Sequence, residues 1–258
     1  MKNIIYYFSG TGNNLAVANH IGDLLGDTEV VSILALINNN NINEIYERIG
    51  FVFPVYYSHM PKVVERILNN LTFNSNQYIF GVIAHAGARG MAMQELRGIV
   101  KNNGASLSGE FRVRMPGNYI VEYGAFPKVL CNILFKREEK TIRKINKVIK
   151  NKEITRLIKP DLISNIYHKS TVKIVNSLGE KDKGFKVNSK CVGCQICKEV
   201  CPVDNITILD GKPIWNNKCQ QCMACIQGCP SEAIRYLNKI RKRYFHPEIK
   251  VIDIIKNK

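Results

Sequence analysis

The stretch IIYYFSGTGNN, residues 4–14, decides how the first half of this chain is built. Residues 4–8 are a short apolar and aromatic run that is typical of a buried parallel strand, and LAVANHIGDLLG at 15–26 continues as a helix. A glycine-rich loop with hydroxyl groups between a strand and a helix presents backbone N–H groups to a phosphate. It is not a dinucleotide fingerprint, because Leu15 stands where the third glycine would be, and it is not a Walker loop.

Strand-like and helix-like segments alternate along the rest of the first half. The strand-like runs are 28–34, 49–57, 77–86 and 111–119, and the helix-like spans among them are 61–71 and 91–104. This alternation predicts an α/β fold with a doubly wound parallel sheet. In such sheets ligands bind outside the carboxyl ends of the strands.

The loop resembles the FMN phosphate loop of flavodoxins, Ser/Thr-x-Thr-Gly-x-Ser/Thr, with Asn14 in place of the final hydroxyl. An Asn amide can still donate a hydrogen bond to phosphate. The resemblance implies a flavodoxin-like sheet with the FMN phosphate held by Ser9, Gly10, Thr11, Gly12, Asn13 and Asn14. The flavin ring is then expected at the other strand ends, against Pro54, Val55, Tyr56 and Tyr57, against Ala86, Gly87 and Ala88, and against Gly117, Asn118 and Tyr119. Tyrosines are also common at strand ends, so these tyrosines indicate a flavin site only because they follow a strand and accompany the phosphate loop.

The second half contains one cysteine pattern twice. CVGCQICKEVCP at 191–202 and CQQCMACIQGCP at 219–230 share their spacing at an offset of 28 residues, and they hold eight of the nine cysteines. Three thiolates on one short loop can reach three corners of a cubane iron–sulfur cluster. Zinc is the alternative for paired Cys-x-x-Cys motifs, but it leaves half of these cysteines and both prolines unexplained. The ninth cysteine, Cys131, lies in an apolar stretch typical of a buried thiol.

With both halves considered, the chain resembles the flavodoxin–ferredoxin fusion proteins of anaerobes over most of residues 1–237. The segments that carry this resemblance are FSGTGNN, FPVYY, MPGNY and the two cysteine runs. In bacterial two-cluster ferredoxins, the fourth cysteine of each run ligates the other cluster. The resemblance therefore implies a small α+β ferredoxin domain with two [4Fe-4S] clusters. Their ligands would be Cys191, Cys194, Cys197 and Cys229 for one cluster, and Cys219, Cys222, Cys225 and Cys201 for the other.

The net charge of +16 comes from two segments only. Residues 1–127 carry 9 basic and 9 acidic side chains and residues 191–237 carry 4 of each, whereas 128–190 carry 17 and 6 and 238–258 carry 7 and 2. The first basic segment has isoleucines at helical spacing, which predicts the last helix of the α/β domain with a solvated basic face. The alternative interpretation is that this segment is a docking surface for an acidic electron-transfer protein or redox enzyme, or for an anionic membrane surface. Nucleic acid is the least favoured partner, because no binding motif is present.

The expected organisation has four parts. These are a flavodoxin-like FMN-binding domain at 1–150, a basic helical linker at 151–182, a two-[4Fe-4S] ferredoxin domain at 183–237 and a basic C-terminal tail at 238–258. No apolar run reaches the roughly 18 residues of a membrane span. The first residues do not resemble a secretory signal, and cluster assembly needs free thiols, so we expect a cytoplasmic protein.

The leading functional hypothesis is electron transfer between the two clusters and FMN, and on to a protein or small-molecule partner. One alternative is a ferredoxin carried on a docking domain that no longer binds FMN, which Asn14 and the segment Ser58-His59-Met60 motivate. Another is a reductase with a small substrate at the flavin. No Ser-His-Asp set or acid pair is recognisable, so no catalytic residue is assigned, and the five histidines show no metal-ligand spacing.

Overall fold

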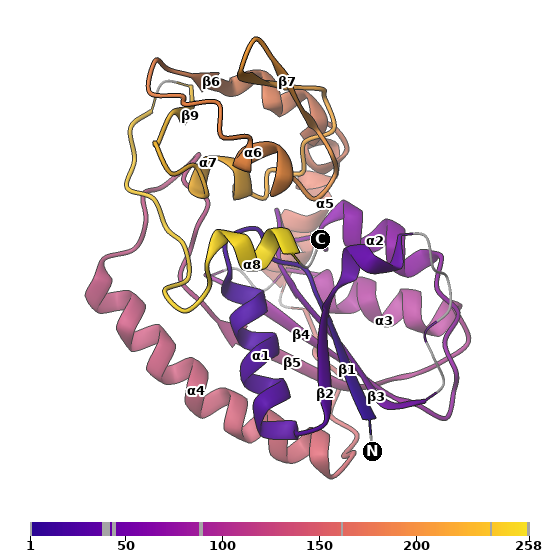
Figure 1. The fold of residues 1–258 in the computed structure, drawn as a ribbon. Coiled ribbons are helices and arrows are strands. Elements are labelled where there is room, and N and C mark those ends of the chain that lie inside the picture. Colours follow the sequence, from indigo (N-terminus) through magenta and orange to yellow (C-terminus); the bar gives the residue numbers. More distant parts are fainter. Residues whose placement is uncertain are drawn as a thin grey trace.

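The structure is a computed structural model, and it describes residues 2–37, 42, 45–87, 90–160, 162–237 and 239–256. Ala88, which the sequence places in the flavin-ring loops, lies outside the described residues. A five-stranded sheet forms the centre of the first half, and a small module lies beyond the carboxyl ends of its strands (Figure 1).

All neighbouring strands of the large sheet are parallel, in the order β2-β1-β3-β4-β5. The strands are β1 Lys2–Tyr7, β2 Thr28–Ser32, β3 Tyr46–Pro54, β4 Tyr78–His85 and β5 Leu107–Arg114. This is the flavodoxin-like order, in which the chain reverses direction of winding between β1 and β3 and leaves a ligand crevice there. The doubly wound α/β fold predicted from the sequence is confirmed.

Helices cover both faces of the sheet, because β1 has apolar residues on both sides. Ile5 and Tyr7 pack under the α1 and α4 helices, whereas Ile4 and Tyr6 pack under α2 and α3. The helices are α1 Asn13–Leu25, α2 Lys62–Asn69, α3 Ala92–Asn102 and α4 Lys128–Lys150, with a short 3-10 turn, η1 Ile33–Leu36, after β2. Along α4 the buried residues include Ile142, Ile145 and Ile149, while its lysines and arginines from Lys136 onwards are exposed.

Two strands differ from their expected bounds by three residues or more at both ends. The strand expected at 111–119 begins at Leu107 and ends at Arg114. It begins early because Gly109 fits closely against β4, where a Cβ would lie 2.9 Å from the Cβ of Phe80. The strand expected at 49–57 ends at Pro54, because Tyr57 and the next residue have positive φ and turn the chain.

The cysteine-containing module is built from two antiparallel strand pairs and two single-turn helices. β6 Phe185–Val187 pairs with β9 Ile234–Tyr236, and β7 Ile206–Leu209 pairs with β8 Lys212–Trp215. The helices are α6 Ile196–Glu199 and α7 Ala224–Gln227. The 28-residue repeat of the sequence is present in the backbone, because three pairs of residues at this offset have positive φ: Gly193 (69°) and Gln221 (54°), Gln195 (63°) and Met223 (64°), and Asp204 (48°) and Glu232 (50°).

The segment between the two modules is helical only in part. Residues 151–160 run along the edge of β5, where the Thr155 N–H donates to the Ser108 carbonyl (3.0 Å). The helix α5 Leu162–Asn176 and the 3-10 segment η2 Leu178–Gly184 then lead to β6. The C-terminal segment returns to the large module, where α8 Val251–Lys256 lies near the start of α1 (Figure 1). Within the described residues, no helix combines the length and the hydropathy needed to cross a membrane.

Candidate functional site

The loop after β1 forms a cradle of backbone N–H groups at the start of α1. The residue before this helix, Gly12, has a φ of 92°, which favours glycine, and it has no side chain of its own to cap the helix. The Ser9 hydroxyl oxygen accepts from the N–H groups of Gly12 (3.1 Å) and Asn14 (3.3 Å), which therefore point toward one place. Converging N–H groups at the positive end of a helix dipole suit an anion such as a phosphate.

The two asparagines of the loop differ in what their side chains do. Asn13 uses both ends of its amide inside the protein, donating to the Pro116 carbonyl (3.0 Å) and accepting from the Tyr244 hydroxyl (2.5 Å). Asn14 is 3% exposed, and its side-chain oxygen has no hydrogen-bond partner among the described residues. Asn13 therefore holds the loop in position, whereas the side-chain oxygen of Asn14, a hydrogen-bond acceptor, is left unpaired.

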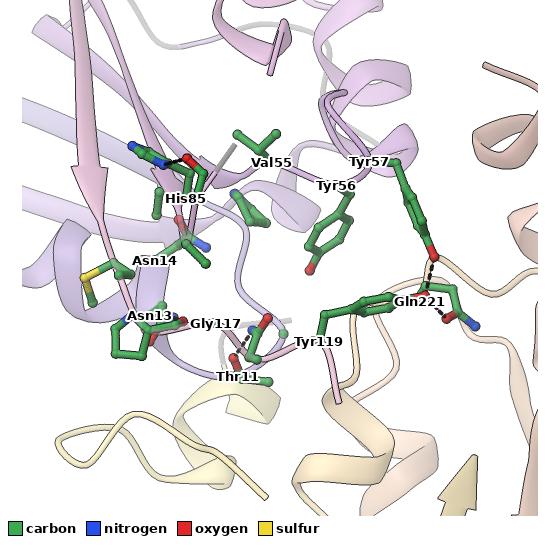
Figure 2. A pocket seen from close by; sticks show the side chains of 18 of the residues that line it. Thr11, Asn13, Asn14, Val55, Tyr56, Tyr57, His85, Gly117, Tyr119 and Gln221 are labelled. Atoms are coloured by element: carbon green, nitrogen blue, oxygen red, sulfur yellow. Dashed lines mark hydrogen bonds between the residues drawn. The ribbon is translucent and has the colours of Figure 1, made fainter. Parts of the chain in front are cut away.

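One cavity of about 240 Å³ lies at the carboxyl ends of the strands (Figure 2). Of the residues expected around a flavin, its lining contains Ser9, Gly10, Thr11, Asn13, Asn14, Pro54, Val55, Tyr56, Tyr57, Ala86, Gly87, Gly117, Asn118 and Tyr119. Gly12 lies at the start of α1 and does not line the cavity. The described lining contains no lysine or arginine and one carboxylate, so backbone groups and neutral side chains would do the binding.

Nine lining residues were not among those expected from the sequence. Ser58, Ala84, His85, Met115 and Pro116 lie within two positions of an expected residue, whereas Glu122, Tyr123, Tyr167 and Gln221 do not. Tyr167 comes from α5, which the sequence predicts only as part of a linker. Gln221 comes from the second cysteine run, between Cys219 and Cys222, and so the cysteine module contributes directly to the cavity. Its position within the Cys-x-x-Cys spacing was the one signal that could have identified it.

Three side chains form a hydrogen-bonded chain at one wall of the cavity (Figure 2). The hydroxyls of Tyr57 and Tyr119 are hydrogen-bonded to each other, and their rings meet edge to face with centroids 5.6 Å apart. The Tyr119 hydroxyl donates to the side-chain oxygen of Gln221 at 3.1 Å, so the Tyr57 hydroxyl donates to Tyr119. Burial raises the pKa of Tyr57 to about 12 and raises the pKa of Tyr119 further, so both hydroxyls keep their protons at neutral pH.

The cysteines gather around two small cavities. One is lined by Cys191, Cys194, Cys197 and Cys229, which we call the outer set, and the other by Cys201, Cys219, Cys222 and Cys225, which we call the inner set. This grouping matches the ligand sets expected from the sequence, in which each run supplies its fourth cysteine to the other group; cluster ligation itself stays a prediction. Cys194 is exposed and every member of the inner set is buried.

Burial and hydrogen bonding act in opposite directions on the cysteine sulfurs. Burial raises the pKa of Cys197 and of Cys219 to about 11, so iron would have to displace a proton from each as a cluster assembles. The sulfur of Cys201 accepts from the Asn205 N–H (3.3 Å), and the sulfur of Cys229 accepts from the Ala233 N–H (3.4 Å). Such N–H···S bonds tune the reduction potential of a cluster.

The inner cysteine loop packs directly against the phosphate cradle. A Cβ added to Gly10 would overlap the carbonyl oxygen of Cys222 and would lie 3.1 Å from its carbonyl carbon. The side chain of Gln227, in α7, donates to the Asn118 carbonyl at 2.8 Å. Two loops that bind different cofactors in other proteins are thus in van der Waals contact here.

Residues 190–234 match the family described as the 4Fe-4S dicluster domain. The C-terminal region therefore carries a small 4Fe-4S ferredoxin domain. No curated protein matches the chain.

Several solved structures resemble part of the chain. They include the two-electron reduced flavodoxin of Megasphaera elsdenii, which is 23% identical over 43% of this chain and 84% of its own, with a TM-score of 0.36. The flavoprotein of Lactobacillus acidophilus in complex with FMN is 17% identical over 43% of this chain and 92% of its own, with a TM-score of 0.34. A Streptococcus pneumoniae flavodoxin is 13% identical over 58% of this chain and 98% of its own, with a TM-score of 0.39. Because these TM-scores are low, the fold assignment rests on the order of the strands in the sheet. This chain combines a flavodoxin-like sheet with a 4Fe-4S ferredoxin domain.

Proposed function

We propose that the chain is an electron-transfer protein in which two [4Fe-4S] clusters and FMN lie in series. The observation that carries the proposal is that one cavity is lined both by the phosphate cradle and by Gln221 of the inner cysteine loop. A flavin in this cavity would therefore adjoin the inner cluster.

The residues of the cavity fit FMN. The N–H groups of Gly12 and Asn14, which here donate to the Ser9 hydroxyl oxygen, and the side-chain NH2 group of Asn14 would hold the phosphate at the start of α1. The apolar and aromatic side chains of Val55, Tyr56 and Tyr57 would cover the ring and keep water from it. FMN supplies the exchange between one-electron and two-electron transfer when it is bound.

The two cysteine sets differ in their distance from the cavity and in their exposure to solvent. The inner set touches the cradle through Gly10 and is shielded from solvent. The outer set includes the exposed Cys194, so we propose that electrons are exchanged with a partner there. Lys190 and Lys198 are exposed and adjoin cysteines of this set in the sequence, which favours an acidic electron-transfer protein or redox enzyme as the partner.

Anaerobic purification followed by iron, sulfide and flavin assays tests this proposal. We expect about eight irons and about one FMN per chain. The flavin-free protein should bind FMN at least about tenfold more tightly than riboflavin, because riboflavin lacks the phosphate that the cradle would hold. The Asn14→Ala variant should lose affinity for FMN but not for riboflavin, and Asn19→Ala, on the same helix but outside the cradle, serves as the matched control.

Two outcomes would contradict the proposal. Eight irons with no binding of added FMN would leave a ferredoxin carried on a docking domain. Equal affinity for FMN and riboflavin would show that the loop after β1 holds no phosphate.

A further inference from the structure

Two histidines and a glutamate from three different elements meet beside the cavity. His59 lies between β3 and α2, Glu95 lies in α3 and His168 lies in α5. Nδ1 of His59 and Nε2 of His168 each lie 2.9 Å from Oε1 of Glu95. The three atoms all lie within 4.8 Å of one another, a separation that allows one metal ion to contact them all.

The hydrogen bonds around this group determine where the ring proton of His59 lies. Its Nε2 is 3.1 Å from the carbonyl oxygen of His168, which can only accept, so Nε2 carries the proton. In the neutral ring, Nδ1 therefore directs a lone pair toward the carboxylate oxygen of Glu95. At 2.9 Å these two atoms can be held together by a second ring proton or by a metal ion.

The surroundings hold these side chains in position for a metal ion. The second carboxylate oxygen of Glu95 accepts from the Met60 N–H at 2.6 Å, so Oε1 is left to face the histidines. A ring N–H donated to a backbone carbonyl and a carboxylate held by a backbone N–H are the usual outer contacts of metal ligands in proteins. The side chains of Glu95 and His168 are 25% and 22% exposed, which leaves solvent access for a water as a further ligand.

We propose that His59 Nδ1, Glu95 Oε1 and His168 Nε2 bind a divalent transition metal ion of the zinc type. Two imidazoles and one carboxylate form a known zinc ligand set, with a water in the fourth position. The inference does not depend on the function proposed above, because none of the three ligands belongs to the cysteine sets or to the phosphate cradle.

The ion would attach α5 to the loop that carries Tyr57. This helix already touches the loop through Thr171, whose hydroxyl donates to the Tyr57 carbonyl at 2.8 Å. Tyr167, next to the proposed ligand His168, lines the cavity. Metal binding would therefore fix the helix that closes this side of the cavity.

Zinc binding to the protein as purified, with its clusters and flavin retained, tests the site. Equilibrium dialysis against Zn²⁺ with metal analysis should find one zinc per chain in the wild type. The His168→Gln variant should bind it at least about tenfold more weakly. The matched control is His20→Gln: His20 also contacts two carboxylates, but through opposite ring nitrogens, so it is no chelate and its loss should leave zinc binding unchanged.

X-ray absorption at the zinc edge separates this site from the cysteines. Zinc on the proposed ligands has nitrogen and oxygen neighbours at about 2.0–2.2 Å, whereas zinc on cysteine has sulfur at about 2.3 Å. A sulfur shell in the wild type, or equal zinc binding by wild type and His168→Gln, would overturn the proposal. Thr171→Val, which removes one contact of α5 but no ligand, should keep its zinc, and the loss in His168→Gln is then the loss of a ligand and not of the docking of α5.

Discussion

Replacing Gly10 by alanine would force apart the phosphate cradle and the inner cysteine loop. The added Cβ would overlap the carbonyl oxygen of Cys222 and would lie 3.1 Å and 3.2 Å from the carbonyl carbon and the Cβ of that residue. None of these atoms can rotate away, since they belong to the backbone or are fixed to it. The loops would have to separate by about 1 Å to regain ordinary van der Waals distances.

The size of the effect follows from this overlap. Adding a methyl group to a site with no room for it costs about 1–3 kcal/mol. The melting temperature should fall by about 2–4 °C for each kcal/mol in a domain of this size. If the same strain opposes the FMN-bound form of the cradle, the dissociation constant for FMN rises by about 5- to 150-fold.

Both effects are measurable against a matched glycine. FMN affinity is read from the quenching of flavin fluorescence during titration, and stability from anaerobic thermal unfolding. Gly98, in α3, has open space where a Cβ would be, so Gly98→Ala should leave FMN affinity unchanged and stabilise the helix by about 0.5–1 kcal/mol. Wild-type FMN affinity and melting temperature in Gly10→Ala would refute the contact between the two loops.

Three further predictions concern a buried ion pair, a histidine and the fourth cysteines. Glu110→Ala should destabilise the protein by about 3 kcal/mol in urea unfolding, because the buried carboxylate binds Arg97 through two bonds of 2.5 and 2.6 Å; a cost below 1 kcal/mol would contradict this. A hydrogen bond to a neighbouring carboxylate raises the pKa of His20 to about 9, so its contribution to stability is complete below its ordinary pKa of about 6.5 and is lost as the pH rises through about 9. Thermal unfolding between pH 6 and 10 should show this loss in the wild type and a flatter profile in His20→Gln. Cys201→Ser and Cys229→Ser should each lower the iron content from about eight to about four, Cys201→Ser by losing the inner cluster and Cys229→Ser the outer, and an equal loss of both clusters in either variant would contradict the assignment.

Local spacing predicted the parts of the site that are contiguous in the chain. The cradle follows from a strand, a glycine-rich loop and a helix in succession. The cysteine groups follow from the repeat together with the resemblance to two-cluster ferredoxins, in which the fourth cysteines cross over. The sequence predicts that the strand β5 begins at residue 111, whereas it begins at Leu107. The first residues of the strand include Gly109, which packs against β4 but has a low propensity for strands.

Contacts between distant segments could not be predicted in this way. The sequence spacing of His59 and His168 predicts no metal site, yet α5 folds back so that their rings stack with centroids 3.8 Å apart. Tyr244 lies in what the sequence shows only as a basic tail, and its hydroxyl holds Asn13 in the cradle. Such contacts depend on how α5 and the C-terminal segment pack, and no local pattern encodes that packing.

The two copies of the 28-residue repeat differ at the position where one copy contacts the cavity wall. Gly193 and Gln221 occupy the same place in the two copies and have similar left-handed backbones, with φ of 69° and 54°. Glycine adopts this conformation freely, while a residue with a side chain loses about 1 kcal/mol there. The outer copy keeps the unstrained residue and does not line the cavity, whereas the inner copy accepts the strain and has a side chain that accepts from the Tyr119 hydroxyl. The two halves of the module are thus equivalent in backbone and unequal in role, and exchanging these two residues would leave the module's shape intact while removing the hydrogen bond that Tyr119 donates to it.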